Sequence, residues 1–254
     1  VHGVRITPNR VAGTVTVDVD ADVPVTITKV AGFESVLTPV KSSTAYDQRD
    51  IELGMALDVT GSMGGSKIAN LKLAAKDLID ILIPDSGSTN TVRIGLAPYA
   101  ASVNAGSFAS IVTNGRSTRC VHERPGSEAF TDYAPGTGSW IGYTGGMSCP
   151  SARIEPLTND KSLLKSRIDT YSASGMTAGH IGAAWAWYLV SPEWASIWPS
   201  ASRPVSYSEP NTVKAIILMT DGEFNRQYIS SNGSSSSQAL NLCDEMKDKD
   251  VVVY

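Results

Sequence analysis

The sequence predicts an α/β domain in which a mostly parallel, doubly wound sheet is flanked by helices, preceded by a small β-rich element. Two patterns favour this class: apolar strands alternate with amphipathic helices through most of the chain, and the amino-terminal part alternates apolar with polar residues. With 254 residues and 42% hydrophobic content, the chain can bury a full core. We expect the β-rich segment over residues 1–45 and the α/β domain over residues 46–254.

The first part of the chain is expected to be extended. Residues 11–30 alternate with a period of two and are interpreted as two half-buried strands, and residues 36–45 as a link to the main domain. The α/β domain then begins with an apolar strand at 51–57, an amphipathic helix at 67–82 and a strand at 92–99.

An irregular insertion at about 100–160 interrupts this rhythm. We expect short strands inside it, because structureless loops of that length are rare in compact domains. The later elements are predicted as a helix at 161–171, a second helix with an apolar stripe after Thr177, a strand at 213–219, a helix at 238–249 and a final strand.

The cysteines bear on the compartment. Cys120 and Cys149 bracket the Gly-, Pro- and Tyr-rich part of the insertion. A disulfide between them would contribute roughly 3 to 4 kcal/mol and would indicate an oxidising compartment. The alternative is a pair of reduced, half-buried thiols. Cys243 has no partner in this chain, so it is either buried or paired with a segment beyond Tyr254.

Charge and hydropathy argue against nucleic-acid binding and against a membrane span. The chain has 21 basic and 25 acidic residues, a net charge of -4, and no basic cluster, so nucleic acid is not an expected partner. No run of eighteen apolar residues is present, so no membrane span is expected. The chain lacks an initiator Met and ends within a strand pattern, which indicates a fragment or a processed product.

Three loops carry oxygen-bearing side chains at the ends of strands or the starts of helices. Asp58, Thr60 and Ser62 follow the strand at 51–57, Thr177 precedes a helix, and Asp221 follows the strand at 213–219. Ligands bind open α/β sheets at the carboxyl ends of their strands, so we expect these five side chains to converge. Oxygen ligands of mixed charge suit a hard divalent cation such as Mg²⁺.

This set is similar to the metal-ion-dependent adhesion site of von Willebrand factor A (vWA) domains. The resemblance covers roughly residues 50–254, with Thr60 where the family usually has Ser. It implies that the hydroxyls of Thr60, Ser62 and Thr177 contact Mg²⁺, with Ca²⁺ or Mn²⁺ as alternatives, and that Asp58 and Asp221 act through water. An exposed Asp or Glu of a protein partner would complete the coordination. The resemblance implies a binding module and not an enzyme.

Short accessory runs resemble those of TadG-like proteins of bacterial tight-adherence (Tad/Flp) pilus systems. The runs are TRCVHERP at 118–125, IEPLT at 154–158 and AWAWYLVSP at 184–192. This second resemblance implies a role in adhesion or pilus assembly, with pilus or envelope components as partners. It also implies an extracytoplasmic location in the bacterial cell envelope, the periplasm or the cell surface, and an amino-terminal membrane anchor outside this chain.

Two other functions stay open. The run DVTGS resembles the phosphorylated loop of aspartyl-phosphate pumps, which would make Asp58 the nucleophile of a phosphotransferase or phosphohydrolase, although Val59 stands where that loop has Lys. Alternatively, the metal site is vestigial and the domain is a structural spacer in the envelope.

Several isolated residues are candidates for a functional role. His180 is interpreted as a solvated first-turn residue, with a position at the edge of the metal face as the alternative. Trp140, Trp194 and Trp198 lie in loop-like segments and are candidates for a partner surface.

Overall fold

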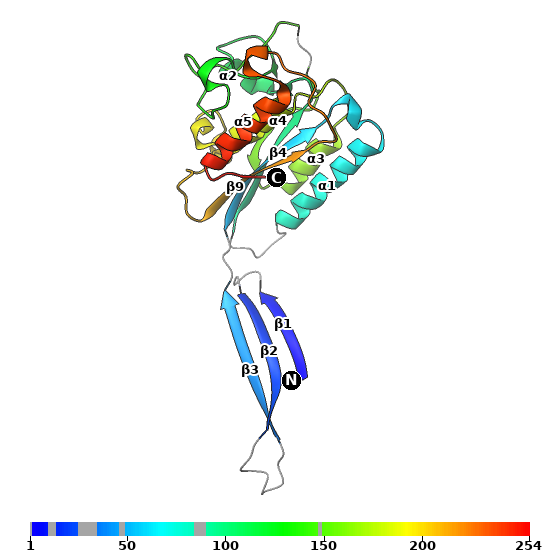
Figure 1. Cartoon of the computed structure of the whole chain (residues 1–254), viewed down its shortest axis with the longest axis vertical. Helices are drawn as coiled ribbons and strands as arrows, with labels where there is room; N and C mark the ends of the chain where they lie inside the picture. Colours follow the sequence, from blue (N-terminus) through cyan, green and yellow to red (C-terminus); the bar gives the residue numbers. More distant parts are fainter. Residues whose placement is uncertain (1, 10–13, 25–34, 46–48, 84–89, 147–148) are drawn as a thin grey trace. The chain divides into compact units, whose positions relative to one another are not determined.

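The structure is a computed structural model that describes residues 2–9, 14–24, 35–45, 49–83, 90–146 and 149–254 (Figure 1). The chain divides into two units, each with its own sheet. One unit contains Val1–Arg49 and Pro84–Asn90, and the other contains Asp50–Ile83 and Thr91–Tyr254.

The first unit is a three-stranded antiparallel sheet in the order β1 (His2–Asn9), β2 (Thr14–Pro24), β3 (Ser35–Ala45). The link expected at residues 36–45 is therefore wrong, since these residues pair with β2 along its whole length. Pro39 argued against a strand at this position, but a proline is tolerated there because β3 is an edge strand. Of the two strands expected at 11–30, the structure describes β2, and residues 11–13 and 25–34 lie outside the described residues.

The second unit has a mixed seven-stranded sheet in the order β10-β9-β4-β5-β6-β7, with β8 also paired to β5. The predicted α/β class is confirmed. The parallel strands are β4 (Asp50–Asp58), β5 (Val92–Tyr99), β9 (Thr212–Met219) and the short β10 (Val252–Val253). The antiparallel additions come from the insertion and its end: β6 (Val103–Asn104), β7 (Cys120–Val121) and β8 (Glu155–Thr158).

Helices cover both faces of this sheet (Figure 1). One face carries α1 (Ser66–Leu82) and α3 (Lys161–Asp169), and the other carries α4 (Gly179–Val190) and α5 (Ser235–Asp248). Among the described residues, none of the helices combines the length and apolar character that crossing a membrane requires. The short helix α2 (Ala109–Val112) lies in the insertion, and 3-10 turns occur at Gly61–Met63, Gly106–Phe108, Gly126–Glu128, Pro192–Trp194, Ser200–Ser202 and Ser230–Asn232.

Strand β4 separates two hydrophobic cores because its side chains alternate between the faces of the sheet. Its large residues, Leu53, Met55 and Leu57, pack on the side of α1 and α3. The opposite face carries Gly54 and Ala56, which allows α4 to lie very close to the sheet. A Cβ added at Gly54 would stand 2.2 Å from the carbonyl oxygen of Ala186 in α4.

Helix α4 is enclosed on every side, and all twelve of its residues are buried. The apolar stripe predicted after Thr177 is thus part of a helix that is apolar on all sides except at His180, as expected for a helix between a sheet and another helix. Two of the three loop tryptophans extend this core, whereas Trp140 is half-buried. Trp194 and Trp198 are 0% and 2% exposed, so the prediction that they form a partner surface is wrong.

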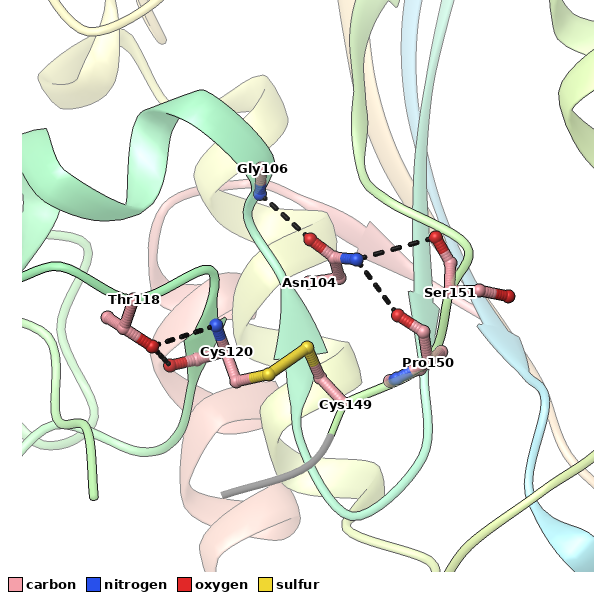
Figure 2. Close-up of a disulfide and its surroundings, with 7 residues drawn as sticks. All are labelled: Asn104, Gly106, Thr118, Cys120, Cys149, Pro150 and Ser151. Atoms are coloured by element: carbon pink, nitrogen blue, oxygen red, sulfur yellow. Dashed lines mark hydrogen bonds between the residues drawn. A yellow bond between two sulfur atoms is a disulfide. The ribbon is translucent and has the colours of Figure 1, made fainter. Parts of the chain in front are cut away.

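The insertion is fixed to the sheet by a disulfide between Cys120 and Cys149, the pair expected from the sequence (Figure 2). Asn104 of β6 reinforces the connection: its side-chain amide donates to the carbonyl oxygen of Pro150 at 2.9 Å and accepts from the N–H of Gly106 at 3.0 Å. The return segment that begins at Cys149 is therefore held by both covalent and polar contacts.

Candidate metal centre

The carboxyl ends of β4 and β9 bring two of the predicted loops together. The strands are parallel neighbours, and Leu57 pairs with Met219. The chain therefore leaves the sheet at the same edge after both strands, with Asp58 at the end of β4 and Asp221 two residues beyond β9.

Three of the five predicted side chains form a continuous row of oxygen atoms. The hydroxyl oxygens of Thr60 and Ser62 lie 2.9 Å apart, and the Ser62 hydroxyl donates to Oδ1 of Asp221, also at 2.9 Å. Neighbouring ligands in an octahedron with Mg–O distances of about 2.1 Å are separated by about 2.9 Å. The spacing and the chemistry of these oxygens fit a small divalent cation.

Asp58 is hydrogen-bonded beside the row of oxygens, to the backbone of Thr60 and to Thr220. It is fully buried, its Oδ1 accepts the N–H of Thr60 at 2.9 Å, and its Oδ2 accepts the hydroxyl of Thr220 at 2.8 Å. With both oxygens occupied and no exposed surface, this carboxylate is poorly placed to attack a phosphodonor.

Burial, and next the nearby Asp58 charge, raise the pKa of Tyr99 far above its usual value, so this phenol stays neutral.

The Thr177 loop lies against the Thr60 loop through its backbone. The carbonyl oxygen of Gly175 accepts the N–H of Gly61 at 2.8 Å, and Gly175 has a positive φ of 90° that favours glycine. Thr177 itself is bonded to the Asp221 side of the site: its N–H donates to Oδ1 of Asn225 at 2.9 Å, and its carbonyl oxygen accepts the N–H of Asn225.

The structure thus gathers the three loops but does not join all five side chains. Within the described chain, the Thr177 hydroxyl makes no hydrogen bond to Thr60, Ser62 or Asp221. Asp58 contacts the row through the backbone of Thr60 and not through its hydroxyl. The direct side-chain contacts run from Thr60 to Ser62 and from Ser62 to Asp221.

Lys67 is a site residue that the sequence reasoning missed. Its ammonium pairs with Oδ2 of Asp221 and, through this hydrogen bond, lowers the pKa of that carboxyl. The Asp221 carboxylate is therefore already in contact with a positive charge. The available signal was position, because Lys67 lies in the first turn of α1, five residues after Ser62.

The ligand set depends on hydroxyl oxygens. Among the described residues, no group of three or more His, Cys, Asp or Glu side chains is placed to hold a metal ion. A site of the zinc type is therefore not found in that part of the chain, and the row of Thr60, Ser62 and Asp221 is the candidate for a hard cation.

His180 is not the solvated residue expected from its place in the first turn of α4. It is 1% exposed, and its Nδ1 lies 2.7 Å from the hydroxyl of Ser235 in α5. The close approach of α5 to α4 covers it, which the sequence around His180 alone did not reveal.

Comparison with known proteins gave structural neighbours only, as no family model and no curated protein sequence matches the chain. The vWF domain of the type V pili tip protein Mfa5 from Porphyromonas gingivalis is 16% identical over 75% of this chain and 44% of its own, with a TM-score of 0.44. The pilus adhesin SpaC from Lactobacillus rhamnosus GG is 12% identical over 99% and 27%, with a TM-score of 0.41.

A von Willebrand factor type A protein from Catenulispora acidiphila is 14% identical over 99% of this chain and 38% of its own, with a TM-score of 0.38. The chain spans less than half the length of each of these proteins. At such TM-scores, the fold class rests on the strand order and helix layers of the chain itself. The second unit is thus an α/β domain with a mixed sheet between helices, and the solved structures to which the chain is similar include a vWF domain of a pilus tip protein and a von Willebrand factor type A protein.

Proposed function

We propose that the second unit is a divalent-metal-dependent protein-binding module of a bacterial pilus or cell-envelope assembly. The observation that carries the proposal is the row of oxygens from Thr60 through Ser62 to Asp221, at the carboxyl edge of the sheet and with the spacing of magnesium ligands.

Each residue has a distinct role in this proposal. Thr60, Ser62 and Thr177 would contribute hydroxyl oxygens, Asp221 would contribute charge, and Asp58 fixes the backbone of the Thr60 loop. A bound Mg²⁺ would supply a Lewis-acidic position for a carboxylate oxygen of the partner. Because few carboxylates of this chain are available to neutralise the ion, an external Asp or Glu would be strongly attracted.

A cavity of about 260 Å³ lies beside the Ser174–Gly175 part of the Thr177 loop and would offer room for a neighbouring side chain of the partner. Its described lining, which includes Ala101, Pro150, Ser174 and Gly175, contains no charged side chain. Met176 on the same loop is 49% exposed, which adds an apolar contact beside the site. These features favour an acidic partner residue flanked by an uncharged one.

The disulfide bears on location. The bond between Cys120 and Cys149 persists in oxidising compartments, which for a bacterium are the periplasm and the exterior. We propose an extracytoplasmic location for this reason, in line with the pilus and envelope partners that the TadG-like motifs imply.

The proposal is tested by calorimetric titration of Mg²⁺ into chelator-treated protein. Ser62→Ala should weaken binding at least tenfold while shifting the melting temperature little, because Ser62 is exposed. Ser110→Ala, which removes an exposed hydroxyl outside the site, is the matched control and should bind like the unmodified protein. Absence of any heat or thermal shift with Mg²⁺ in the unmodified protein would instead support the structural spacer.

Partner chemistry is tested with a displayed library of random peptides selected in Mg²⁺ and eluted with a chelator. Enrichment of Asp or Glu that is lost with the Ser62→Ala protein would support recognition of a carboxylate. Selected peptides without acidic residues would overturn that part of the proposal.

A further inference from the structure

Glu123 is a buried carboxylate that contacts the segment carrying Asp221 and the helix that follows Thr177. It lies in the insertion, two residues beyond β7, and is 5% exposed. Its Oε1 accepts two consecutive backbone N–H groups, from Tyr228 and, at 2.6 Å, from Ile229. Buried carboxylates that accept several backbone N–H groups fix the backbone strongly, because losing them leaves both the charge and the N–H groups without partners.

These bonds complete a second attachment for the Asp221 segment. The first attachment is at Thr177, whose carbonyl oxygen accepts the N–H groups of Asn225 and Arg226 at 2.9 and 3.0 Å. The second is at Glu123, a few residues further along. The chain is therefore held to the Thr177 loop at residues 225–226 and to Glu123 at residues 228–229, a few residues beyond Asp221.

The other oxygen of Glu123 faces two imidazoles. Oε2 lies 3.5 Å from Nε2 of His180 and 3.6 Å from Nδ1 of His122. His180 is three residues after Thr177, and its second nitrogen lies 2.7 Å from the Ser235 hydroxyl at the start of α5. The cluster of Glu123, His122, His180 and Ser235 thus connects the insertion with α4, α5 and the Asp221 segment.

The order Ser235, His180, Glu123 has the connectivity of a hydrolase triad, but the geometry excludes that activity. Ser235 and His180 are 0% and 1% exposed, and the adjoining cavity measures about 10 Å³, which is about the room that one water molecule requires. No acyl substrate can reach the Ser235 hydroxyl. The cluster is therefore better explained by what it holds in place.

We propose that Glu123 is a positioning residue for the metal site, which fixes the Asp221 segment relative to Thr177 and thereby sets the affinity for the ion. The inference rests on the proposed function for its affinity part, while the fixing of the segment is independent of any metal. Residues that orient metal ligands typically change affinity by roughly 10- to 100-fold when they are replaced.

The charge state of Glu123 agrees with this role. Burial acts to raise the pKa of the carboxyl, but the neighbouring His122 and His180 and the N–H of Ile229 outweigh it and hold the pKa well below its usual range. Glu123 is therefore an anion over the working pH range. Of the other groups that face the cluster, Arg124 is cationic, and burial raises the pKa of Tyr188, which stays neutral.

The test compares Glu123→Gln with Asp132→Asn. Both changes neutralise a buried carboxylate of the insertion, but Asp132 accepts hydroxyls from Ser191 and Tyr207 and has no bond to a ligand loop. Glu123→Gln should weaken Mg²⁺ binding about tenfold or more and speed amide hydrogen exchange over residues 222–229 in metal-free protein. Asp132→Asn should change neither, even where it lowers the melting temperature equally.

The outcomes separate the two levels of the proposal. In one outcome, amide exchange over 222–229 is faster in Glu123→Gln, but neither the unmodified protein nor any variant binds Mg²⁺. This outcome would overturn the proposed function, while the role of Glu123 in fixing the segment would stand. Unchanged exchange and affinity in Glu123→Gln would overturn the inference. If Glu123→Gln fails to fold, Ser235→Ala, which removes a hydroxyl partner of His180, should give the same changes at smaller size, and an unchanged result there overturns it equally.

Discussion

The ammonium of Lys67 competes with any cation for Asp221, so its removal should strengthen metal binding. It pairs with Oδ2 of Asp221, while Ser62 bonds Oδ1 of the same carboxylate. A divalent charge among the oxygens of Thr60, Ser62 and Asp221 would lie about 6 Å from this ammonium, given Mg–O distances near 2.1 Å. Repulsion between +2 and +1 at that distance is about 1.4 kcal/mol in water.

Salt reduces this repulsion by about half at physiological ionic strength, where the screening length is about 8 Å. Lys67→Gln should therefore raise the affinity for Mg²⁺ about tenfold at low salt and about threefold at physiological salt. Isothermal titration calorimetry at the two ionic strengths measures both values. The lost pair is partly exposed, with the Lys67 side chain 55% and the Asp221 side chain 12% exposed, and its loss should cost the fold less than about 1 kcal/mol.

Lys76→Gln is the matched control. It makes the same change of charge on the same helix, and Lys76 pairs with Asp169. Nine residues of helix place it about 13 Å further along the axis, beyond the screening length at physiological salt. Equal affinities for the Lys67→Gln, Lys76→Gln and unmodified proteins at physiological salt, where the Lys76 charge is screened, would refute the assignment of the ion to the Asp221 carboxylate.

Three further predictions concern stability. Replacing Cys120 and Cys149 by Ser should lower the free energy of unfolding by roughly 3.5 kcal/mol in urea titrations, from the entropy of a loop with a sequence separation of 29. Gly54→Ala should cost about 1–3 kcal/mol or more and lower the melting temperature, because the added Cβ would meet the Ala186 carbonyl at 2.2 Å. The depressed pKa of Glu123 means that its contribution is complete above its usual value of 4.5 and is lost as the pH falls toward the folded-state value. In urea titrations, the free energy of unfolding should fall less between pH 7 and pH 3 for Glu123→Gln than for the unmodified protein.

The periodic parts of the chain were predictable because burial imposes a repeat. Strands β4, β5 and β9 and helices α1 and α3 lie within a few residues of their expected positions. The start of α5 differs, because the helix predicted at 238–249 begins three residues earlier, at Ser235. In the structure, Ser234 caps this helix by accepting the N–H of Ser237.

The contacts that define the candidate site were only partly predictable. The rule for parallel strands places Asp58 and Asp221 at one edge, but it does not say which oxygens touch. Lys67 and Glu123 escaped notice because their importance comes from partners 154 and 105 residues away in sequence. No local pattern marks such a pair, and neither did any pattern mark the burial of His180.

The complete enclosure of α4 has a consequence for how affinity can vary. Thr177 precedes a helix whose residues are all buried, so packing already restricts the backbone on this side of the site. Gly222 and Glu223, in contrast, are exposed on the opposite loop. Substitutions that alter the affinity for a partner should therefore be tolerated more often in the Asp221 loop than in the Thr177 loop.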